Sequence, residues 1–157
     1  MLGSAAIAIA VAMTLENQPA AAKGSYKGCQ VWVSSIQKGR KISPFFGGSL
    51  ESTRAGHSIL EALVWFKGTN EAGDGDCTTV DCSAVRLVNS YDGHDYDQYK
   101  GDAGQAGCGE FHSVDKNPLR KKRRVEGIAT FYFSIPDDTD VKRLHLLLGN
   151  ERLLLKK

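Results

Sequence analysis

Hydrophobic and polar residues alternate most regularly between residues 125 and 135 of this chain. Small or apolar residues recur there at every second position, the spacing of a half-buried strand; they are Val125, Gly127, Ala129, Phe131, Phe133 and Ile135. Pro136 has no N–H to donate to a neighbouring strand, and residues 137–140 are turn formers. Because residues 141–148 are again mostly apolar, the pattern predicts two paired antiparallel strands joined by this turn.

Four further segments have the length and composition of strands, with Gly68 expected to end the second of them. The predicted strands are residues 30–36, 55–66, 83–91 and 153–155, and long loops are expected at 39–48 and 94–117. Short strands separated by glycine, proline and aspartate are typical of all-β domains. We therefore predict an all-β, immunoglobulin-like antiparallel β-sandwich, with Trp32 and Trp65 in its core.

The first 22 residues have the pattern of a secretory signal peptide. Residues 5–13 form an apolar block too short to span a bilayer, and Ala20 and Ala22 satisfy the small-residue rule for cleavage. No basic residue precedes the block, and a buried N-terminal helix is the alternative. We expect a signal at 1–22, one domain at 23–157, a secreted protein, and no transmembrane span in the mature chain.

The number of cysteines is even, as expected for an exported protein with disulfide bonds. Three pairings are open; we favour Cys77 with Cys82, around an acidic turn, and Cys29 with Cys108, from the first strand to the long loop. Lipid attachment at Cys29 is disfavoured because small apolar residues do not precede it. Zinc is disfavoured because no second ligand pair has the required spacing.

Three motifs follow one another along the predicted strands. Residues 55–70 contain a glycine, a hydrophobic strand and an asparagine turn; residues 85–96 contain an apolar strand and a D-G-x-x-Y-like turn. Residues 125–136 contain a strand similar to V-x-G-x-x-x-F-x-x-P, through Val125, Gly127, Phe131 or Phe133, and Pro136. In this order they resemble the telokin-like, immunoglobulin-fold domain family of exported Gram-positive bacterial proteins, over about residues 25–156.

That resemblance implies the fold and export, and it carries over no catalytic residue, because the family is largely of unknown function. The chain departs from the family in two places. A Pro-Gly-like turn usually precedes the V-x-G strand, where this chain has Arg120, Lys121, Lys122, Arg123 and Arg124. The two cysteine pairs would be local additions.

The five consecutive basic residues 120–124 are the most unusual local feature of the chain. One interpretation is a solvated loop that keeps a sheet edge from pairing with another chain. The other is contact with an anionic surface such as phospholipid headgroups, teichoic acid or acidic glycan. Nucleic acid is not an expected partner, because no aromatic residue is interleaved with these basic residues.

Acidic residues are concentrated between residues 71 and 102. Asp92, Asp95 and Asp97 are candidate calcium ligands, although the segment lacks the length and distal glutamate of a helix–loop–helix calcium site. Turn formation and solubility are the simpler explanation. His94 and His112 share the predicted long loop with Asp95, Asp97, Glu110 and Asp115, so a metal-binding protein or metal-dependent hydrolase is the alternative function.

No nucleophile motif such as G-x-S-x-G is present, and the net charge is only +2. Tyr91, Tyr96 and Tyr99 could anchor a protein partner. We therefore predict an exported, non-catalytic binding module without a cofactor, whose partner is a protein or an anionic cell-envelope polymer.

Overall fold

The computed structural model describes residues 23–71, 80, 82–99, 112–113 and 122–155. Within them, eleven strands and two short 3₁₀ turns follow one another. They are β1 (Gly24–Tyr26), β2 (Cys29–Gly39), β3 (Lys41–Ile42), β4 (Leu50–Glu51), β5 (His57–Glu71), η1 (Cys82–Ala84), β6 (Val85–Asn89), β7 (Asp95–Tyr96), β8 (His112–Ser113), β9 (Lys122–Pro136), η2 (Val141–Arg143), β10 (Leu144–Leu148) and β11 (Glu151–Leu154). The predicted all-β class is confirmed.

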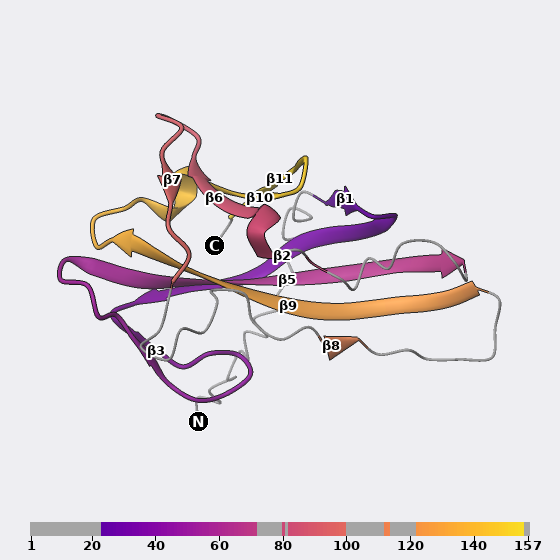
Figure 1. Ribbon diagram of the computed structural model, residues 1–157, viewed down its shortest axis with the longest axis horizontal. Coiled ribbons are helices and arrows are strands. Elements are labelled where there is room, and N and C mark those ends of the chain that lie inside the picture. Colours follow the sequence, from indigo (N-terminus) through magenta and orange to yellow (C-terminus); the bar gives the residue numbers. More distant parts are fainter. Residues whose placement is uncertain (1–22, 72–79, 81, 100–111, 114–121, 156–157) are drawn as a thin grey trace, which may run out of the picture.

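The strands form two facing sheets, as Figure 1 shows. One sheet has the order β1-β2-β5-β9-β8 and is built on two 15-residue strands, β5 and β9. The other has the order β11-β10-β6-β7. All strand pairs among the described residues are antiparallel. The architecture is an immunoglobulin-like antiparallel β-sandwich.

The core fills the space between the two sheets. Alternate residues of β5 and β9 face it, including Phe66, Phe131 and Phe133, each fully buried. The opposite sheet contributes mainly leucines: Leu87 from β6, Leu144, Leu146 and Leu148 from β10, and Leu153 from β11. The inward face predicted for residues 129–135 is therefore confirmed, because Ala129, Phe131, Phe133 and Ile135 belong to this core. Each such side chain contributes about 1.5–3 kcal/mol by leaving water.

The two predicted core tryptophans lie elsewhere. Trp32 and Trp65 are paired across β2 and β5, between the inward-facing pairs Val31–Phe66 and Val33–Val64. They therefore lie on the outer face, where their rings stack at 6.3 Å with an interplanar angle of 8°. The prediction is wrong because β5 is apolar on both faces, so its pattern does not indicate which face is inside.

Two strand boundaries also differ from prediction. Gly68 does not end β5, which continues to Glu71, and β9 begins at Lys122 instead of Val125. The two extensions pair with each other, with Glu71 opposite Lys122. Backbone hydrogen bonding between two long strands therefore overrides the weak strand preferences of glycine and of consecutive basic residues. Figure 1 shows this ribbon extending beyond the shorter sheet.

Strands β3 and β4 form a small hairpin where the sequence predicted only a loop. The hairpin lies on the face of the five-stranded sheet that points away from the four-stranded sheet (Figure 1). Ile42 packs there against Ile59 and Tyr132 and makes a second, smaller apolar cluster with them. The hairpin thereby covers one end of the outer face.

Candidate functional site

A pocket of about 570 Å³ opens beside the end of β9. One wall is the loop between β4 and β5, and the other is the segment that follows β7. The lining is almost entirely polar: Ser52, Thr53, Arg54, Ser83, Asp97, Gln98, Tyr99 and Ser134.

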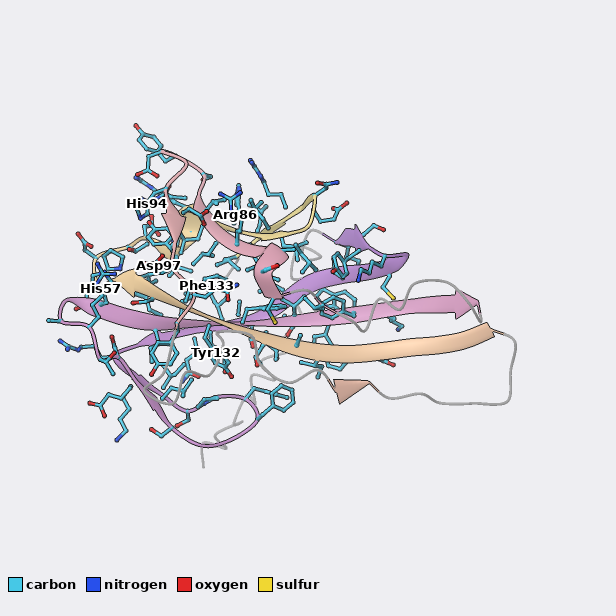
Figure 2. All side chains as sticks on the ribbon, in the orientation of Figure 1. His57, Arg86, His94, Asp97, Tyr132 and Phe133 are labelled. Carbon is cyan, nitrogen blue, oxygen red and sulfur yellow. The ribbon has the colours of Figure 1, made fainter. Side chains whose placement is uncertain are left out.

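The segment after β7 leaves the four-stranded sheet and joins the five-stranded one. Asp97 accepts a hydrogen bond through its carbonyl from the N–H of Ser134 at 3.0 Å, and the N–H of Tyr99 donates to the carbonyl of Tyr132 at 2.9 Å. Between them, Gln98 forms a bridge with Phe133. Figure 2 shows Asp97 beside Phe133, at the end of the molecule where β9 ends. A chain that changes sheets makes a corner of the sandwich, and the pocket lies at this corner.

The Gln98 side chain fixes the corner from inside. Its amide nitrogen donates to the carbonyl of Cys82 at 2.7 Å and to the carbonyl of Val85 at 2.9 Å. These bonds tie the crossing segment to η1 and β6. Asp97 and Tyr99, on either side of Gln98, line the pocket together with it.

The other wall is held by the backbone of the β4–β5 loop. The N–H of Ser52 donates to the carbonyl of Arg40 at 2.7 Å, and the N–H of His57 donates to that of Arg54 at 3.2 Å. The hydroxyl of Tyr99 crosses between the walls and donates to the carbonyl of Glu51 at 2.9 Å. The pocket therefore has a hydrogen-bonded frame on both sides.

Arg54 and Asp97 provide opposite charges in this frame. Among the described residues, neither the guanidinium of Arg54 nor the carboxylate of Asp97 makes a hydrogen bond or an ion pair. Ser52, Thr53 and Ser134 also line the pocket, and the partly buried Tyr99 at its edge packs against the second apolar cluster. The lining residues include neither histidine nor cysteine, and what they offer a ligand is mainly hydrogen bonding.

The three aspartates predicted to bind calcium make separate contacts in the structure. The Asp92 carboxylate accepts a hydrogen bond from the N–H of His94 at 2.9 Å, and Asp95 pairs with Arg86, whose Nε lies 2.7 Å from Oδ2. Asp97 lines the pocket. In the part of the chain that the structure describes, no three His, Cys, Asp or Glu residues are grouped closely enough to hold a metal ion. The structure thus does not bring Asp92, Asp95 and Asp97 together.

The histidines of the alternative metal site are also apart. The His94 ring packs edge-on against Tyr96, with centroids 4.7 Å apart, on the β6–β7 turn. His112 belongs to β8, where its backbone pairs with Ile128 of β9. Residues 100–111, which connect the two in sequence, lie outside the described residues.

Only part of the basic run is described. Arg120 and Lys121 lie outside the described residues, and Lys122, Arg123 and Arg124 form the start of β9. Their backbones pair with residues 69–71 of β5. Residues 122–124 therefore lie in a strand, whereas the simpler interpretation of the sequence predicted a solvated loop.

Cys29 and Cys82 are each in a disulfide bond, and the described residues contain no free cysteine. Cys77 and Cys108 lie outside the described residues, so the predicted pairing stays a prediction. Among the three predicted tyrosines, Tyr91 is exposed, Tyr96 packs against the core, and Tyr99 lines the pocket.

Most of the pocket was not predicted from the sequence. Asp97 was singled out as a metal ligand and Tyr99 as a protein contact, whereas Arg54 and Ser134 gave no signal. The pocket depends on Gln98 pairing with Phe133, and such a tertiary pairing leaves no local motif. The only local signal in the sequence is the run of three polar residues at 52–54.

Comparisons with known protein families, curated proteins and solved structures give no match. The resemblance to the telokin-like domain family therefore stays a prediction. No helix in the described part of the chain is long and apolar enough to cross a membrane.

Proposed function

We propose that this protein is an exported, non-catalytic binding module that recognises an anionic polymer of the cell envelope. The observation that carries the proposal is the pocket lined by Arg54 and Asp97, two exposed residues whose charged groups make no hydrogen bond or ion pair within the described part of the chain. A binding protein needs hydrogen-bonding groups that are fixed in position and free to bind.

The chemistry of the lining favours a hydroxyl-rich ligand. Hydrogen bonds to charged groups are stronger than those between neutral groups, so Arg54 and Asp97 would supply most of the polar contact. The serine and threonine hydroxyls both donate and accept, as sugar hydroxyls do. A repeating unit of a glycan or of a polyol phosphate has this combination of groups.

The basic run would provide a second contact for the same polymer. Ser134 and Lys122 lie on one strand, and twelve residues at strand spacing separate them by about 40 Å. A single sugar cannot reach both places, whereas an extended anionic chain can. The pocket would then supply specificity, and residues 120–124 would supply salt-sensitive attraction.

The supporting sequence features concern location. The apolar block at residues 5–13 and the even number of cysteines favour export, and the family resemblance favours the cell surface. A protein partner would use the same exposed loops, and the experiment below separates it from a polymer.

The test measures binding of the purified chain to isolated cell-wall polymer, with and without its teichoic acid, at low and high salt. We expect Asp97→Asn and Arg54→Gln each to weaken binding by about tenfold, the equivalent of one charged hydrogen bond. Asp138→Asn, on an exposed turn outside the pocket, is the matched control and should bind normally.

Replacing residues 120–124 by serine should remove the salt-dependent part of binding and leave the dependence on Asp97. If the wild-type chain binds no wall polymer at either salt concentration, the proposed function is wrong. If it binds but both pocket variants behave as Asp138→Asn does, the pocket is not the recognition site.

A further inference from the structure

The loop of the β3–β4 hairpin exposes two adjacent phenylalanines. The exposed large hydrophobic side chains among the described residues are Phe45 at 56%, Phe46 at 38% and Tyr91 at 83%. The rings of Phe45 and Phe46 pack edge to face with their centroids 5.1 Å apart. Two neighbouring rings form a continuous apolar surface, which is unfavourable in water and therefore suggests a binding role.

The backbone holds this aromatic tip in a defined shape. The N–H of Gly47 donates to the carbonyl of Pro44 at 2.9 Å and closes a turn with both phenylalanines at its centre. Gly47 and Gly48 have φ values of 96° and 87°, a conformation that favours glycine. The N–H of Phe45 also donates to Oε2 of Glu61 at 3.1 Å, and Glu61 is buried beneath the loop. The backbone of the aromatic tip is thus held by hydrogen bonds, which lowers the entropic cost of binding.

Exposed basic residues lie at the base of the hairpin that carries the aromatic tip. Residues 38–54 contain four basic residues and one acidic residue, Glu51, which lies opposite Lys41 in the β3–β4 pairing. Lys38 is occupied, since its Nζ donates to the carbonyls of Asp137 and Thr139. Arg40 and Lys41 are exposed at the base of the hairpin. An apolar tip with flanking cations matches the two parts of an anionic bilayer surface, the acyl boundary and the charged headgroups.

We propose that the β3–β4 hairpin docks on an anionic phospholipid bilayer, with Phe45 and Phe46 entering the interface and Arg40 and Lys41 contacting headgroup phosphates. A hydrated wall polymer would leave the two rings in water, so the lipid surface accounts for more of the hairpin. This docking is independent of the proposed polymer binding, because it uses none of the residues that line the pocket.

The experiment is co-sedimentation of the purified chain with vesicles of phosphatidylglycerol and phosphatidylcholine, and with vesicles of phosphatidylcholine alone. We expect binding to the anionic vesicles, and at least a tenfold loss in the double variant Phe45→Ser, Phe46→Ser. Tyr91→Ser, which removes the exposed tyrosine of the β6–β7 turn, is the matched control and should bind as wild type. The apolar segment at residues 5–13 is common to all variants, so it does not affect the comparison.

A second measurement keeps the test valid if the double variant folds poorly. The single variant Phe45→Trp should gain fluorescence that brominated lipids quench, whereas the fluorescence added by Tyr91→Trp should not be quenched. Absence of wild-type binding to anionic vesicles would overturn the proposal. Equal binding of the double variant would assign the attraction to other cations, such as residues 120–124, and would also overturn it. If the purified chain binds no vesicles but captures a protein, and the double variant loses that protein, the partner is a protein and the bilayer proposal is rejected.

Discussion

The backbone N–H of Phe45 donates a hydrogen bond to the carboxylate of Glu61, and this contact fixes the β3–β4 hairpin to the outer face of the five-stranded sheet. Glu61 is only 5% exposed and lies on a central strand, so its carboxylate needs hydrogen-bond donors to replace water. Buried carboxylates are costly without hydrogen-bond donors. The hairpin and the carboxylate therefore depend on each other.

Glu61→Ala should lower the free energy of unfolding by about 1–3 kcal/mol, because it leaves a backbone donor unpaired and creates a small cavity. Glu61→Gln retains an acceptor oxygen and should cost less. Urea denaturation measures both effects, and hydrogen exchange at the amide of Phe45 tests the cause directly. If that amide exchanges equally slowly in wild type and Glu61→Ala, the bond does not hold the hairpin.

The sequence predicted the inward face of a strand where apolar residues alternate with more polar ones. In β9, Phe131 and Phe133 alternate with Thr130 and Tyr132 and belong to the core between the sheets, although Thr130 and Tyr132 are buried on the outer face. In β5, the consecutive residues Leu63 and Val64 are both apolar and both buried. Alternation there carries no information, and Trp65 was placed on the wrong side.

The candidate site was less predictable, for a different physical reason. It exists because residues 97–99 leave one sheet and pair with residues 132–134 of the other. No short-range pattern encodes a pairing between segments more than thirty residues apart. The strand extension to Lys122 was missed similarly, since it depends on its partner Glu71 in β5.

Alkaline pH should destabilise the protein through Tyr132. Burial, with the nearby Glu61 carboxylate adding to it, raises the pKa of Tyr132 from 10.0 to about 12. Above pH 10 the unfolded chain loses this proton and the folded chain keeps it, so stability present below pH 10 falls as pH rises toward 12. By pH 11 the loss is about 1.4 kcal/mol.

Urea denaturation between pH 8 and pH 11 measures this loss. Tyr132→Phe should flatten the alkaline fall, whereas Tyr91→Phe, at an exposed position, should leave it as in wild type. An unchanged slope in Tyr132→Phe would show that another group is responsible.

Gly68 is required where β5 passes Cys29. A Cβ at position 68 would lie 2.6 Å from Sγ of Cys29 and 3.0 Å from its Cα, and the backbone atom cannot easily move. Gly68→Ala should therefore cost about 1–3 kcal/mol of stability, as overpacking does. At Gly24 the closest atoms are the ends of the Glu151 and Leu153 side chains, both at 2.9 Å, so Gly24→Ala should cost less. Thermal unfolding of the two variants under non-reducing conditions makes the comparison, and equal losses would contradict this account.

Acidic pH should destabilise the protein through His145, the second residue of β10. Burial, and secondarily the charge of Arg152, lower the pKa of His145 below 6.5. Its Nδ1 is also buried without a hydrogen-bond partner. The folded state therefore favours the neutral ring, and below pH 6.5 the unfolded chain binds a proton that the folded chain does not. Stability present above pH 6.5 is lost as pH falls through the folded-state pKa.

His145→Leu should remove this acid-dependent loss and raise stability at pH 7, because leucine suits a position between Val88 and Leu154 and leaves no unpaired nitrogen. Arg152→Gln should make the loss smaller, because removing the repulsive charge brings the folded-state pKa of His145 closer to 6.5. His57→Gln, at the start of β5, is the control and should retain the full loss. Urea denaturation from pH 7.5 to pH 5 distinguishes these cases. A His145→Leu variant that loses stability as steeply as wild type would show that carboxylate protonation, and not this imidazole, sets the acid limit of the fold.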